Sequence, residues 1–323
     1  MKALVTGAAG FLGRHVVARL LAEGVGVRAL VRNSAATVPA EAERVEVDLG
    51  NLDDDAALRG AVAGVDWVIH AAARVSTSGT WAEFDAANVS GTARLLHAAT
   101  ATGVKRVVHV SSLSVYAVPA NGVTITEDSP YEAGAGERGF YSRSKLIADR
   151  LVMQAACGGA AVTLVRPGLL YGPGRRPPLA RRAIPLGPLR FILGSPRYLL
   201  PMSYVENVAD ALLSAARAEG ASGRAYTVVD ANVPQVEYTE RYRQAAGEHW
   251  RAVYIPAAPL MPMARAAELV FRLIGRSAPL TRHQLRRTTW SAYYDCGRAE
   301  RELGWRPRVD LAEGLRRAFA VVD

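Results

Sequence analysis

Short apolar runs alternate with amphipathic stretches along the first half of the chain. The apolar runs span residues 3–5, 27–31, 45–47, 67–69, 107–110 and 162–165. Between them, residues 11–22, 84–102 and 141–156 carry the apolar spacing of helices. Strands that are apolar on both faces and separated by helices indicate a parallel sheet covered on both sides. The pattern therefore predicts an α/β fold with a doubly wound parallel sheet.

The alternation of apolar runs and amphipathic stretches ends after Tyr171, because residues 172–188 are rich in proline, glycine and arginine. Residues 203–216 then favour a helix, and residues 226–229 a strand that rejoins the first sheet. We therefore expect a Rossmann-type domain over residues 1–172, to which 203–230 return, and a smaller C-terminal region over residues 173–323. No internal repeat and no apolar run long enough to cross a membrane occurs in the sequence.

Composition fits a globular protein, because half of the 323 residues are hydrophobic. The two cysteines, Cys157 and Cys296, lie far apart and show no spacing for zinc, which predicts reduced, packed thiols and no metal. Met1 leads directly into the first expected strand, with no leader-like segment, and this favours the cytoplasm.

The net charge of +9 comes from arginines scattered along the chain and not from one basic block, so we expect no nucleic-acid partner. Only three of the 39 basic residues are lysines, namely Lys2, Lys105 and Lys145. A chain that uses arginine almost everywhere makes each lysine a candidate for chemistry that arginine cannot do.

A glycine turn joins the first strand to the first helix, with Gly7, Gly10 and Gly13 in the segment TGAAGFLG. Unpaired N–H groups and the positive end of the helix dipole meet at such a turn, which suits a pyrophosphate. The spacing alone is a weak signal, but its place in the first βαβ unit predicts a dinucleotide site.

The end of the second strand bears on the choice of dinucleotide. An acidic residue there would accept the ribose hydroxyls of NAD, whereas this chain has Arg32, whose guanidinium suits the 2′-phosphate of NADP. We therefore expect NADP, with NAD as the alternative, and Arg32 as a plain surface residue remains open. Asp48, after the third strand, is placed to meet the adenine edge.

Three side chains form the expected catalytic set. Ser112 follows the strand at 107–110, where ligands of open α/β sheets bind, and Tyr141 and Lys145 lie four residues apart on one helix face. A phenol needs about 4 kcal/mol of extra phenolate stabilisation to lower its pKa from near 10 to 7, which the Lys145 ammonium could help to supply. Ser112 would hydrogen-bond the substrate oxygen.

These residues resemble the short-chain dehydrogenase/reductase superfamily in its extended form, the NAD-dependent epimerase/dehydratase family. The glycine turn, Asp48 and Leu49, the segments HAAA at 70–73, NVSGT at 88–92 and RPGLLYGP at 166–173, and the catalytic set all match in order. Near the end, ELGWRP at 302–307 also resembles the family. One departure is Ala117, where glycine is usual.

The resemblance implies further site residues. Asn88 would order the surroundings of Lys145. Without the resemblance, Asn88 would be interpreted as an ordinary helix residue with a hydrogen-bonded side-chain amide. The cofactor would also contact Phe11, Leu12, Leu49, Ala71, Ala72, Ala73, Pro167, Gly168, Leu169 and Leu170, together with Tyr141 and Lys145. A homodimer built on a four-helix contact is common in this superfamily and is expected here.

The residues of the second, C-terminal region must indicate which reaction of the family the protein catalyses. Residues 256–275 are apolar, with Arg265, Glu268 and Arg272 near one helical face, and resemble the 3β-hydroxysteroid dehydrogenase-like branch. This helix would face the core, cover a substrate pocket or make a peripheral membrane contact. We therefore expect an NAD(P)-dependent oxidoreductase that interconverts a secondary hydroxyl and a ketone on an apolar sterol-like, lipid-like or polyketide-like small molecule.

Two other functions stay open. The four arginines at 175, 176, 181 and 182 lie where a nucleotide-sugar epimerase or dehydratase with tightly bound NAD would grip a pyrophosphate, although such residues are more often solvated. A dinucleotide sensor without catalysis is disfavoured by the intact catalytic set.

Overall fold

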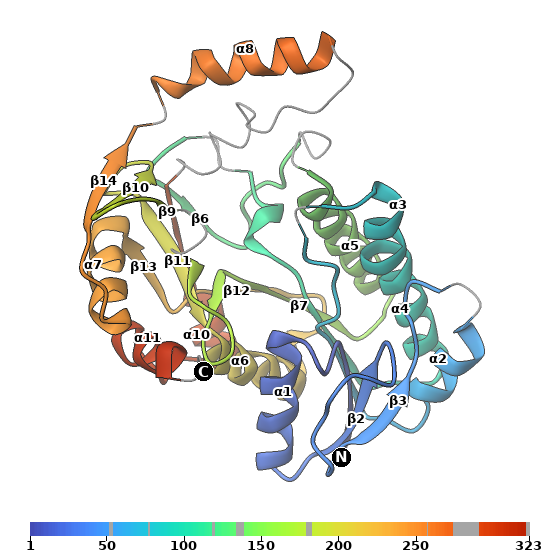
Figure 1. The fold of residues 1–323 in the computed structure, drawn as a ribbon. Coiled ribbons are helices and arrows are strands. Elements are labelled where there is room, and N and C mark those ends of the chain that lie inside the picture. Colours follow the sequence, from blue (N-terminus) through green and yellow to red (C-terminus); the bar gives the residue numbers. More distant parts are fainter. Residues whose placement is uncertain are drawn as a thin grey trace.

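The computed structural model describes residues 1–51, 54–76, 78–117, 120–133, 139–178, 183–256, 258–273 and 291–320. Its centre is a seven-stranded sheet in the order β12-β7-β5-β4-β1-β2-β3, in which every neighbouring pair is parallel (Figure 1). The strands are β1 (Lys2–Thr6), β2 (Gly26–Val31), β3 (Glu43–Glu46), β4 (Trp67–His70), β5 (Arg106–Val110), β7 (Val162–Pro167) and β12 (Ala225–Val228).

Helices cover both faces of this sheet. One face packs against α1 (Phe11–Ala22), α6 (Val205–Arg217) and α10 (Gly297–Leu303). The other face packs against α2 (Asp55–Val62), α4 (Gly91–Ala101) and α5 (Gly139–Cys157). The apolar strands are buried on both sides, as in the strand β7, in which all six residues are buried. The predicted doubly wound parallel sheet is confirmed.

Two predicted helices differ in detail. The helix expected at 84–102 is three consecutive segments, α3 (Trp81–Phe84), the π-helix η2 (Asp85–Ser90) and α4. The Thr92 hydroxyl donates to the Asn88 carbonyl oxygen at 2.7 Å, which helps to satisfy the widened turn. The helix expected at 203–216 begins at Val205 because residues 203 and 204 complete the strand β11.

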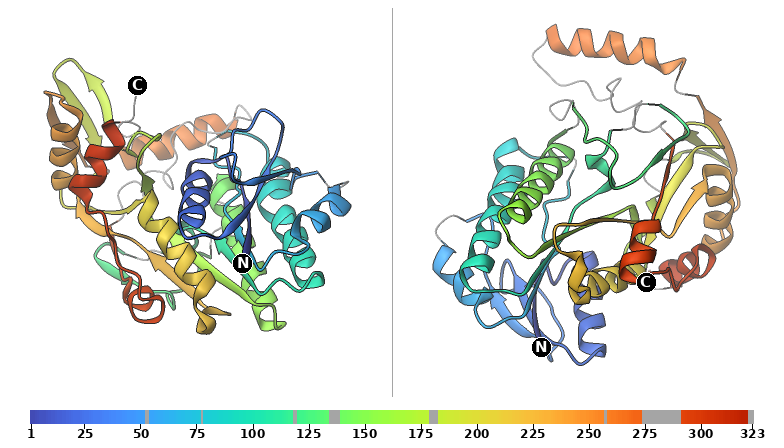
Figure 2. Two further views of the ribbon diagram at one scale, coloured as in Figure 1. Left: turned by 90° about the horizontal axis from the view of Figure 1, so that it is seen from below. Right: turned by 180° about the vertical axis from the view of Figure 1, so that it is seen from behind.

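Smaller sheets, with helices beside them, lie outside the central sheet (Figure 2). Strands β14-β10-β9 form one sheet, β13-β11-β8 another, and β15-β6 pair separately. Their bounds are β6 (Val123–Ile125), β8 (Leu169–Tyr171), β9 (Ala183–Leu186), β10 (Leu189–Leu193), β11 (Leu199–Tyr204), β13 (Ala231–Pro234), β14 (Arg251–Ile255) and β15 (Ala292–Tyr294). The remaining elements are the 3-10 turns η3 (Leu113–Val115) and η6 (Glu219–Ala221) and the helices α7 (Gln235–Ala246), α8 (Leu260–Leu273) and α11 (Leu311–Ala320).

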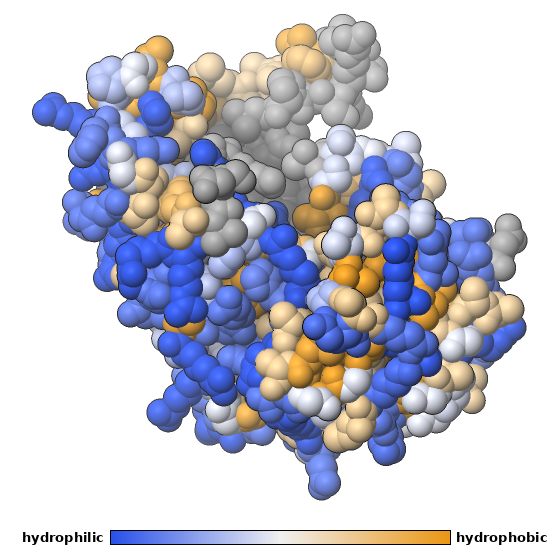
Figure 3. All heavy atoms as spheres, turned by 60° about the horizontal axis from the view of Figure 1, so that its bottom comes forward, coloured by the Kyte–Doolittle hydropathy of each residue, from blue (hydrophilic) through white to orange (hydrophobic). Residues whose placement is uncertain are grey.

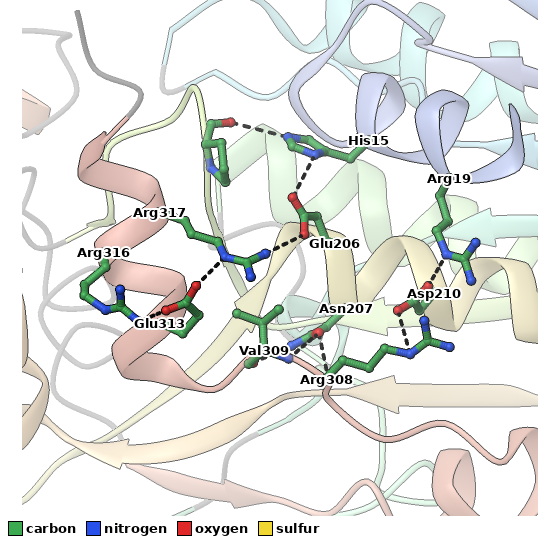
Figure 4. A network of polar contacts seen from close by, with 11 residues as sticks. His15, Arg19, Glu206, Asn207, Asp210, Arg308, Val309, Glu313, Arg316 and Arg317 are labelled. Carbon is green, nitrogen blue, oxygen red and sulfur yellow. Dashed lines mark hydrogen bonds and ion pairs between the residues drawn. The ribbon is translucent and has the colours of Figure 1, made fainter. Parts of the chain in front are cut away.

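Polar contacts fasten the last part of the chain to the first helix (Figure 4). Arg19 of α1 donates to Asp210 of α6 at 2.5 Å, and Arg317 of α11 lies 3.5 Å from Glu206 of α6. Asn207 of α6 donates to the Val309 carbonyl oxygen at 2.8 Å. Helix α6 therefore contacts both α1 and the C-terminal part of the chain.

The surface carries the scattered charge that the sequence suggests. Figure 3 shows a mostly hydrophilic face on which apolar residues gather in limited areas. Both cysteines are free thiols; Cys296 is half-buried, but Cys157 is exposed at the end of α5, so the expectation that it is packed is wrong. Within the described ranges, no helix combines the length and apolarity that a membrane span requires.

Candidate active site

The glycine turn has the backbone geometry that close ligand approach requires. Gly7 adopts φ +65°, and a Cβ at this residue would lie 2.8 Å from the Ala72 Cα atom. A Cβ on Gly13 would lie 2.0 Å from the Gly7 carbonyl oxygen. Helix α1 follows with Gly10 as its N-cap, without a side-chain cap or an acidic residue in its first turn. Its first N–H groups and its positive dipole end therefore face an anion site.

A cavity of 620 Å³ extends from this turn to the ends of β2 and β3. Seven of the predicted cofactor residues line it: Gly7, Gly10, Arg32, Asp48, Leu49, Ala72 and Ala73. Its volume lies in the range of small-molecule sites, and an uncapped helix N-terminus opens at one end. The residues present therefore fit the adenosine and pyrophosphate parts of a dinucleotide.

Other predicted cofactor residues lie outside this cavity. Leu12 and Gly13 are buried below the turn, and Ala71 packs against the hydrophobic core. Phe11 lies at the start of α1 with the guanidinium groups of Arg14 and Arg175 at 5.5 Å and 5.4 Å from its ring centre.

Pro167, Gly168, Leu169 and Leu170 lie at the carboxyl end of β7 and in β8. The Gly168 N–H donates to the Ser203 Oγ at 2.9 Å. These four residues lie at and just after the carboxyl end of β7, and the resemblance assigns to them the nicotinamide contact.

The adenosine end of the cavity is basic. Arg32 is exposed and forms no hydrogen bond or ion pair with a described residue. Arg44 donates to the Asn33 carbonyl oxygen at 3.1 Å and so supports the loop after β2. Asp48 accepts from the Gly50 N–H at 2.9 Å. The guanidinium of Arg32 is thus available to a ligand at the end of β2.

The serines after β5 have different surroundings. Ser111 is buried and its hydroxyl donates to the Asp149 carboxylate at 2.5 Å. Ser112 is half-buried, and its Oγ accepts from the Ser114 N–H at 3.1 Å, which leaves the Ser112 proton able to donate. The structure therefore favours Ser112 over Ser111 as a donor to a substrate oxygen.

Lys145 is buried one helical turn after Tyr141 on α5. Its Nζ donates to the Val110 carbonyl oxygen at 2.8 Å, which ties the ammonium to the end of β5. Burial lowers the pKa of Lys145 to about 8, and the charge of Asp149 opposes that shift. Tyr141 is half-buried in the first turn of α5, where its carbonyl oxygen accepts from the Ser144 hydroxyl at 2.8 Å.

The lowered pKa of Lys145 predicts a pH dependence of stability in the cofactor-free protein. Between the folded pKa of about 8 and the unfolded pKa of about 10.4, the unfolded chain binds this proton and the folded chain does not. Raising the pH through this window therefore stabilises the wild type relative to Lys145→Met, by on the order of 2 kcal/mol from pH 8 to pH 10.

Urea unfolding at several pH values measures this difference. Lys105→Met is the matched control, because the Lys105 side chain is 72% exposed and ion-paired at the surface. A constant free-energy difference between wild type and Lys145→Met across the window would contradict the assignment of a buried, easily deprotonated lysine.

Asn88 projects from the π-helix η2 toward helix α5. Its Nδ2 donates to the Ser144 Oγ at 2.9 Å, and its Oδ1 accepts from the Arg74 N–H at 2.6 Å. Asn88 is 2% exposed. Its amide thus joins the segment after β4 to the residue that precedes Lys145.

A buried ion pair joins helix α5 to strand β7. Arg166, at 2% exposure, contacts both carboxylate oxygens of Asp149, with distances of 2.7 Å and 2.9 Å. The Tyr131 hydroxyl donates to Asp149 at 2.6 Å, and the Tyr116 hydroxyl accepts from Arg166 at 2.7 Å. Every oxygen and nitrogen of the pair is thereby hydrogen-bonded in a site closed to solvent.

The sequence analysis assigned no role to Asp149, Arg166 or the histidines His70 and His109. Burial, and secondarily the charge of Lys145, lowers the pKa of His70 to about 3 and that of His109 well below its usual value. The sequence could have indicated Asp149 as a partner of Lys145, because it follows Lys145 by four residues and so lies on the same helix face. The charged Arg166, directly after the apolar residues Leu164 and Val165 of a buried strand, also indicated a buried partner.

Comparisons with known proteins identify the family of this chain. The profile of the "NAD dependent epimerase/dehydratase family" matches residues 3–228. The chain is 32% identical, over 98% of its length and 95% of the relative's, to a 4-hydroxy-2-methyl-3-oxo-4-farnesyl-3,4-dihydroquinoline-1-oxide ketoreductase of Stigmatella aurantiaca. It is 29% identical, over 97% of its length and 88% of the relative's, to a 3 beta-hydroxysteroid dehydrogenase/Delta 5-->4-isomerase of Mycobacterium tuberculosis.

Solved structures show the same fold. The structure of MoeE5 in complex with UDP-glucuronic acid and NAD superposes with a TM-score of 0.73 at 27% sequence identity, covering 99% of this chain and 98% of that one.

Proposed function

Because the chain belongs to the NAD dependent epimerase/dehydratase family and is an NAD(P)-dependent enzyme of the short-chain dehydrogenase/reductase type, we propose that it interconverts a secondary hydroxyl and a ketone on an apolar small molecule. The observation that carries this proposal is the buried Lys145 ammonium, one helical turn from Tyr141 and bonded to the end of β5. Together with Ser112, this arrangement provides a proton donor and an oxygen-binding group at the carboxyl edge of the sheet.

Each of the three side chains has a defined task in this reaction. Tyr141 gives its phenolic proton to the substrate oxygen during reduction and takes it back during oxidation. Lys145 stabilises the phenolate, because its positive charge lies in a site with little water to screen it. Ser112 donates to the same substrate oxygen and so stabilises its alkoxide character. The bound dinucleotide supplies or accepts the hydride.

The substrate class is proposed from two kinds of support. The two relatives described above are named for a farnesylated ring ketone and for a steroid, which are both largely apolar. In the described second region, Arg175 packs on Phe11 of α1, while Arg176 lines a separate 160 Å³ cavity with Tyr242 and Trp250. These two arginines thus have separate neighbours, whereas Arg181 and Arg182 lie outside the described residues.

A nucleotide-sugar epimerase or dehydratase remains the second candidate, because MoeE5 binds UDP-glucuronic acid and NAD in a similar fold. The two candidates differ in what happens to the cofactor. An epimerase holds NAD tightly and regenerates it within each turnover, whereas the proposed oxidoreductase exchanges it with the solution.

Measuring nicotinamide absorbance with the purified protein distinguishes the two candidate functions. We expect loss of NADPH absorbance on adding an apolar cyclic ketone, with one molecule of alcohol formed for each NADPH consumed. Protein that retains NAD through purification and converts a UDP-sugar without any net change in nicotinamide absorbance would contradict the proposal.

We propose NADP as the preferred dinucleotide. Arg32 supports this, since it lies at the cavity end of β2 and has no carboxylate partner among the described residues. An acidic residue at the end of β2 would suit the ribose hydroxyls of NAD, but the chain has Arg32 followed by Asn33 there.

Arg32→Ala is expected to raise the Kd of NADPH about 10- to 100-fold, since a charged hydrogen bond to phosphate is worth about 1.5–3 kcal/mol. The Kd of NADH is expected to change little, so fluorescence titration with both cofactors measures the effect. Arg197→Ala, at an exposed arginine of the second region, is the control. Equal weakening of both cofactors, or wild-type turnover with NADH as efficient as with NADPH, would contradict the preference.

Helix α8 supports a proposed peripheral membrane contact of a cytoplasmic enzyme. At 100° per residue, its exposed positions fall on one continuous side, and all but one are apolar: Pro262, Met263, Arg265, Ala266, Leu269 and Val270. Met263 is 66% and Leu269 is 62% exposed. Figures 1 and 2 show α8 standing apart from the other helices. This apolar side of α8 is exposed and not packed against the core.

The surface that we propose for α8 is an anionic bilayer, because Arg265 borders the apolar side and the whole chain carries a charge of +9. Flotation with vesicles of anionic phospholipid is expected to carry the wild type but not Leu269→Glu. Val236→Glu, at an exposed apolar residue of α7, is the control that should still float. Equal flotation of all three proteins would contradict this contact.

We also propose a homodimer. Helices α4 and α5 lie side by side on one face of the sheet, as a contact of four helices between two copies requires (Figure 1).

A further inference from the structure

A chain of buried hydrogen bonds leads from the cofactor cavity to the π-helix. The Ala72 N–H donates to the Thr6 Oγ at 3.1 Å, and Thr6 Oγ lies 2.7 Å from the His70 Nδ1. On the other side of the ring, His70 Nε2 lies 2.9 Å from the Thr92 Oγ. Thr92 in turn donates to the Asn88 carbonyl oxygen at 2.7 Å. Thr6, His70 and Thr92 are each at most 1% exposed.

The sheet order creates this chain. Thr6 of β1 and His70 of β4 are register partners in adjacent parallel strands, and both stand at the carboxyl ends of their strands. Thr92 comes from the first turn of α4, which covers the sheet at this place. Three elements that are distant in sequence therefore meet at one imidazole.

The protons in this chain can point in only one direction. Thr92 has one hydroxyl proton and gives it to the Asn88 carbonyl oxygen, so its Oγ must accept from the His70 Nε2–H. A neutral imidazole carries a single N–H, so Nδ1 accepts the hydroxyl proton of Thr6. Thr6 Oγ then accepts from the Ala72 N–H. Every group is satisfied only when His70 is neutral with its proton on Nε2.

The charged and titratable neighbours are compatible with that neutral form. The His109 ring lies 4.9 Å from the His70 ring, and burial keeps it neutral as well. The positive charge of Lys145 further lowers the pKa of His70. An imidazolium at His70 would face both the ammonium and a hydroxyl that already donates to it, so the hydrogen-bond directions persist across the working pH range.

Beyond Asn88, side-chain contacts continue to the catalytic tyrosine. The Asn88 Nδ2 donates to the Ser144 Oγ at 2.9 Å, and the Ser144 hydroxyl donates to the Tyr141 carbonyl oxygen at 2.8 Å. One end of the whole series is therefore Ala72, which lines the cofactor cavity, and the other end is the backbone that carries Tyr141.

We propose that His70 and Thr92 are positioning residues, which hold the π-helix and through Asn88 the first turn of α5, so that Tyr141 keeps a fixed distance from the cofactor cavity. Neither residue contacts the reacting atoms in this role. The proposal rests on the proposed hydride-transfer reaction only for its kinetic readout.

Thr92→Val tests the proposal, because valine has nearly the shape of threonine but can neither accept from His70 nor donate to Asn88. We expect kcat to fall about 10- to 100-fold, the scale of a small displacement of a catalytic group, while the KM for ketone and the Kd of NADPH change less than about 3-fold. Thr92→Ser keeps the hydroxyl and is expected to stay within about 3-fold of the wild-type kcat.

Thr163→Val is the matched control. Thr163 is also 1% exposed, and its hydroxyl also donates to a backbone carbonyl oxygen, that of Ala221 at 2.7 Å, but it lies outside the series. We expect it to lower thermal stability much as Thr92→Val does and to leave kcat nearly unchanged. A kcat for Thr92→Val equal to that of Thr163→Val would overturn the proposal.

A double-variant cycle tests whether His70 transmits the effect. Thr6→Val and Thr92→Val act through the same imidazole, so the double variant is expected to lose little more kcat than the worse single variant. Losses that multiply would show that the two hydroxyls act independently, which contradicts a role for His70.

Amide hydrogen exchange of the cofactor-free protein gives a readout that does not depend on turnover. We expect faster exchange over residues 85–92 in Thr92→Val than in Thr163→Val, since the carbonyl of Asn88 loses its bond. Equal exchange would overturn the proposal. Absence of ketone reduction by the wild type and by Thr163→Val would instead count against the proposed function, and the exchange comparison would still decide on the positioning residues.

Discussion

Tyr141→Phe is expected to lower kcat for ketone reduction by about 10³-fold, because it removes the one proton donor proposed for the substrate oxygen. The Kd of NADPH is expected to change less than about 3-fold, since the cofactor cavity is lined by residues of the glycine turn and the ends of β2 and β3. Stopped-flow measurement of NADPH oxidation and fluorescence titration of the cofactor give the two quantities separately.

The size of this effect follows from the site and not from packing. Tyr141 is only half-buried, and phenylalanine keeps its ring, so the fold is expected to persist. Tyr293→Phe removes the hydroxyl of a tyrosine that is 50% exposed on β15 and is the control for loss of a phenol elsewhere. A Tyr141→Phe enzyme with at least a tenth of the wild-type kcat would remove Tyr141 from the mechanism.

Arg166→Met is expected to lower the free energy of unfolding by about 3–5 kcal/mol, because it leaves the carboxylate of Asp149 buried without its cation. The Ser111 and Tyr131 hydroxyls remain as donors but carry no charge. Methionine fills similar space, so the change isolates the charge more than the volume. Urea unfolding followed by circular dichroism measures the loss.

Arg241→Met is the control for this variant. Arg241 is 42% exposed and forms an i,i+4 ion pair with Glu237 on α7, so its replacement is expected to cost about 0.5 kcal/mol or less. A loss for Arg166→Met within about 1 kcal/mol of that control would mean that Asp149 is not a buried charge that depends on Arg166. Such a result would also weaken the view that the ion pair between Arg166 and Asp149 holds α5 in place.

The central sheet could be predicted because its signal is local. A strand such as β4, with the sequence WVIH, is a short, mostly apolar run. The glycine turn indicates a strand-to-helix junction because its glycines allow the close backbone approach that the junction requires. The pair of Tyr141 and Lys145 could also be predicted, since a spacing of four puts both on one helix face whatever the rest of the chain does.

The positioning residues could not be found in this way, because their contacts depend on the order of strands. His70 meets Thr6 only because β4 pairs with β1, and it meets Thr92 only because α4 covers that junction. The separations of 64 and 22 residues leave no periodic pattern in the sequence. The π-helix at Asp85–Ser90 lies among tertiary contacts of Asn88 with Ser144 and of Thr92 with His70, which helix propensity does not indicate.

The second region was predicted least well. Its small sheets pair strands that are short and only partly buried, such as β9, where Ile184 is 67% exposed. Such strands lack both the continuous apolar run and the strict alternation that identify strands in a sequence. The exposed apolar side of α8 has the same origin, since a helical spacing shows that one side is apolar but not what that side contacts.

Transfer of label from the cofactor to the product tests the proposed reaction most directly. With NADPH carrying deuterium at the transferred position of its nicotinamide ring and an apolar cyclic ketone as substrate, mass spectrometry of the alcohol reads out the hydride donor. We expect one deuterium at the carbinol carbon for each NADPH oxidised, and no labelled alcohol with Tyr141→Phe in the same time. Alcohol without deuterium, or label that stays on the cofactor while a nucleotide sugar is converted, would contradict hydride transfer to an apolar ketone.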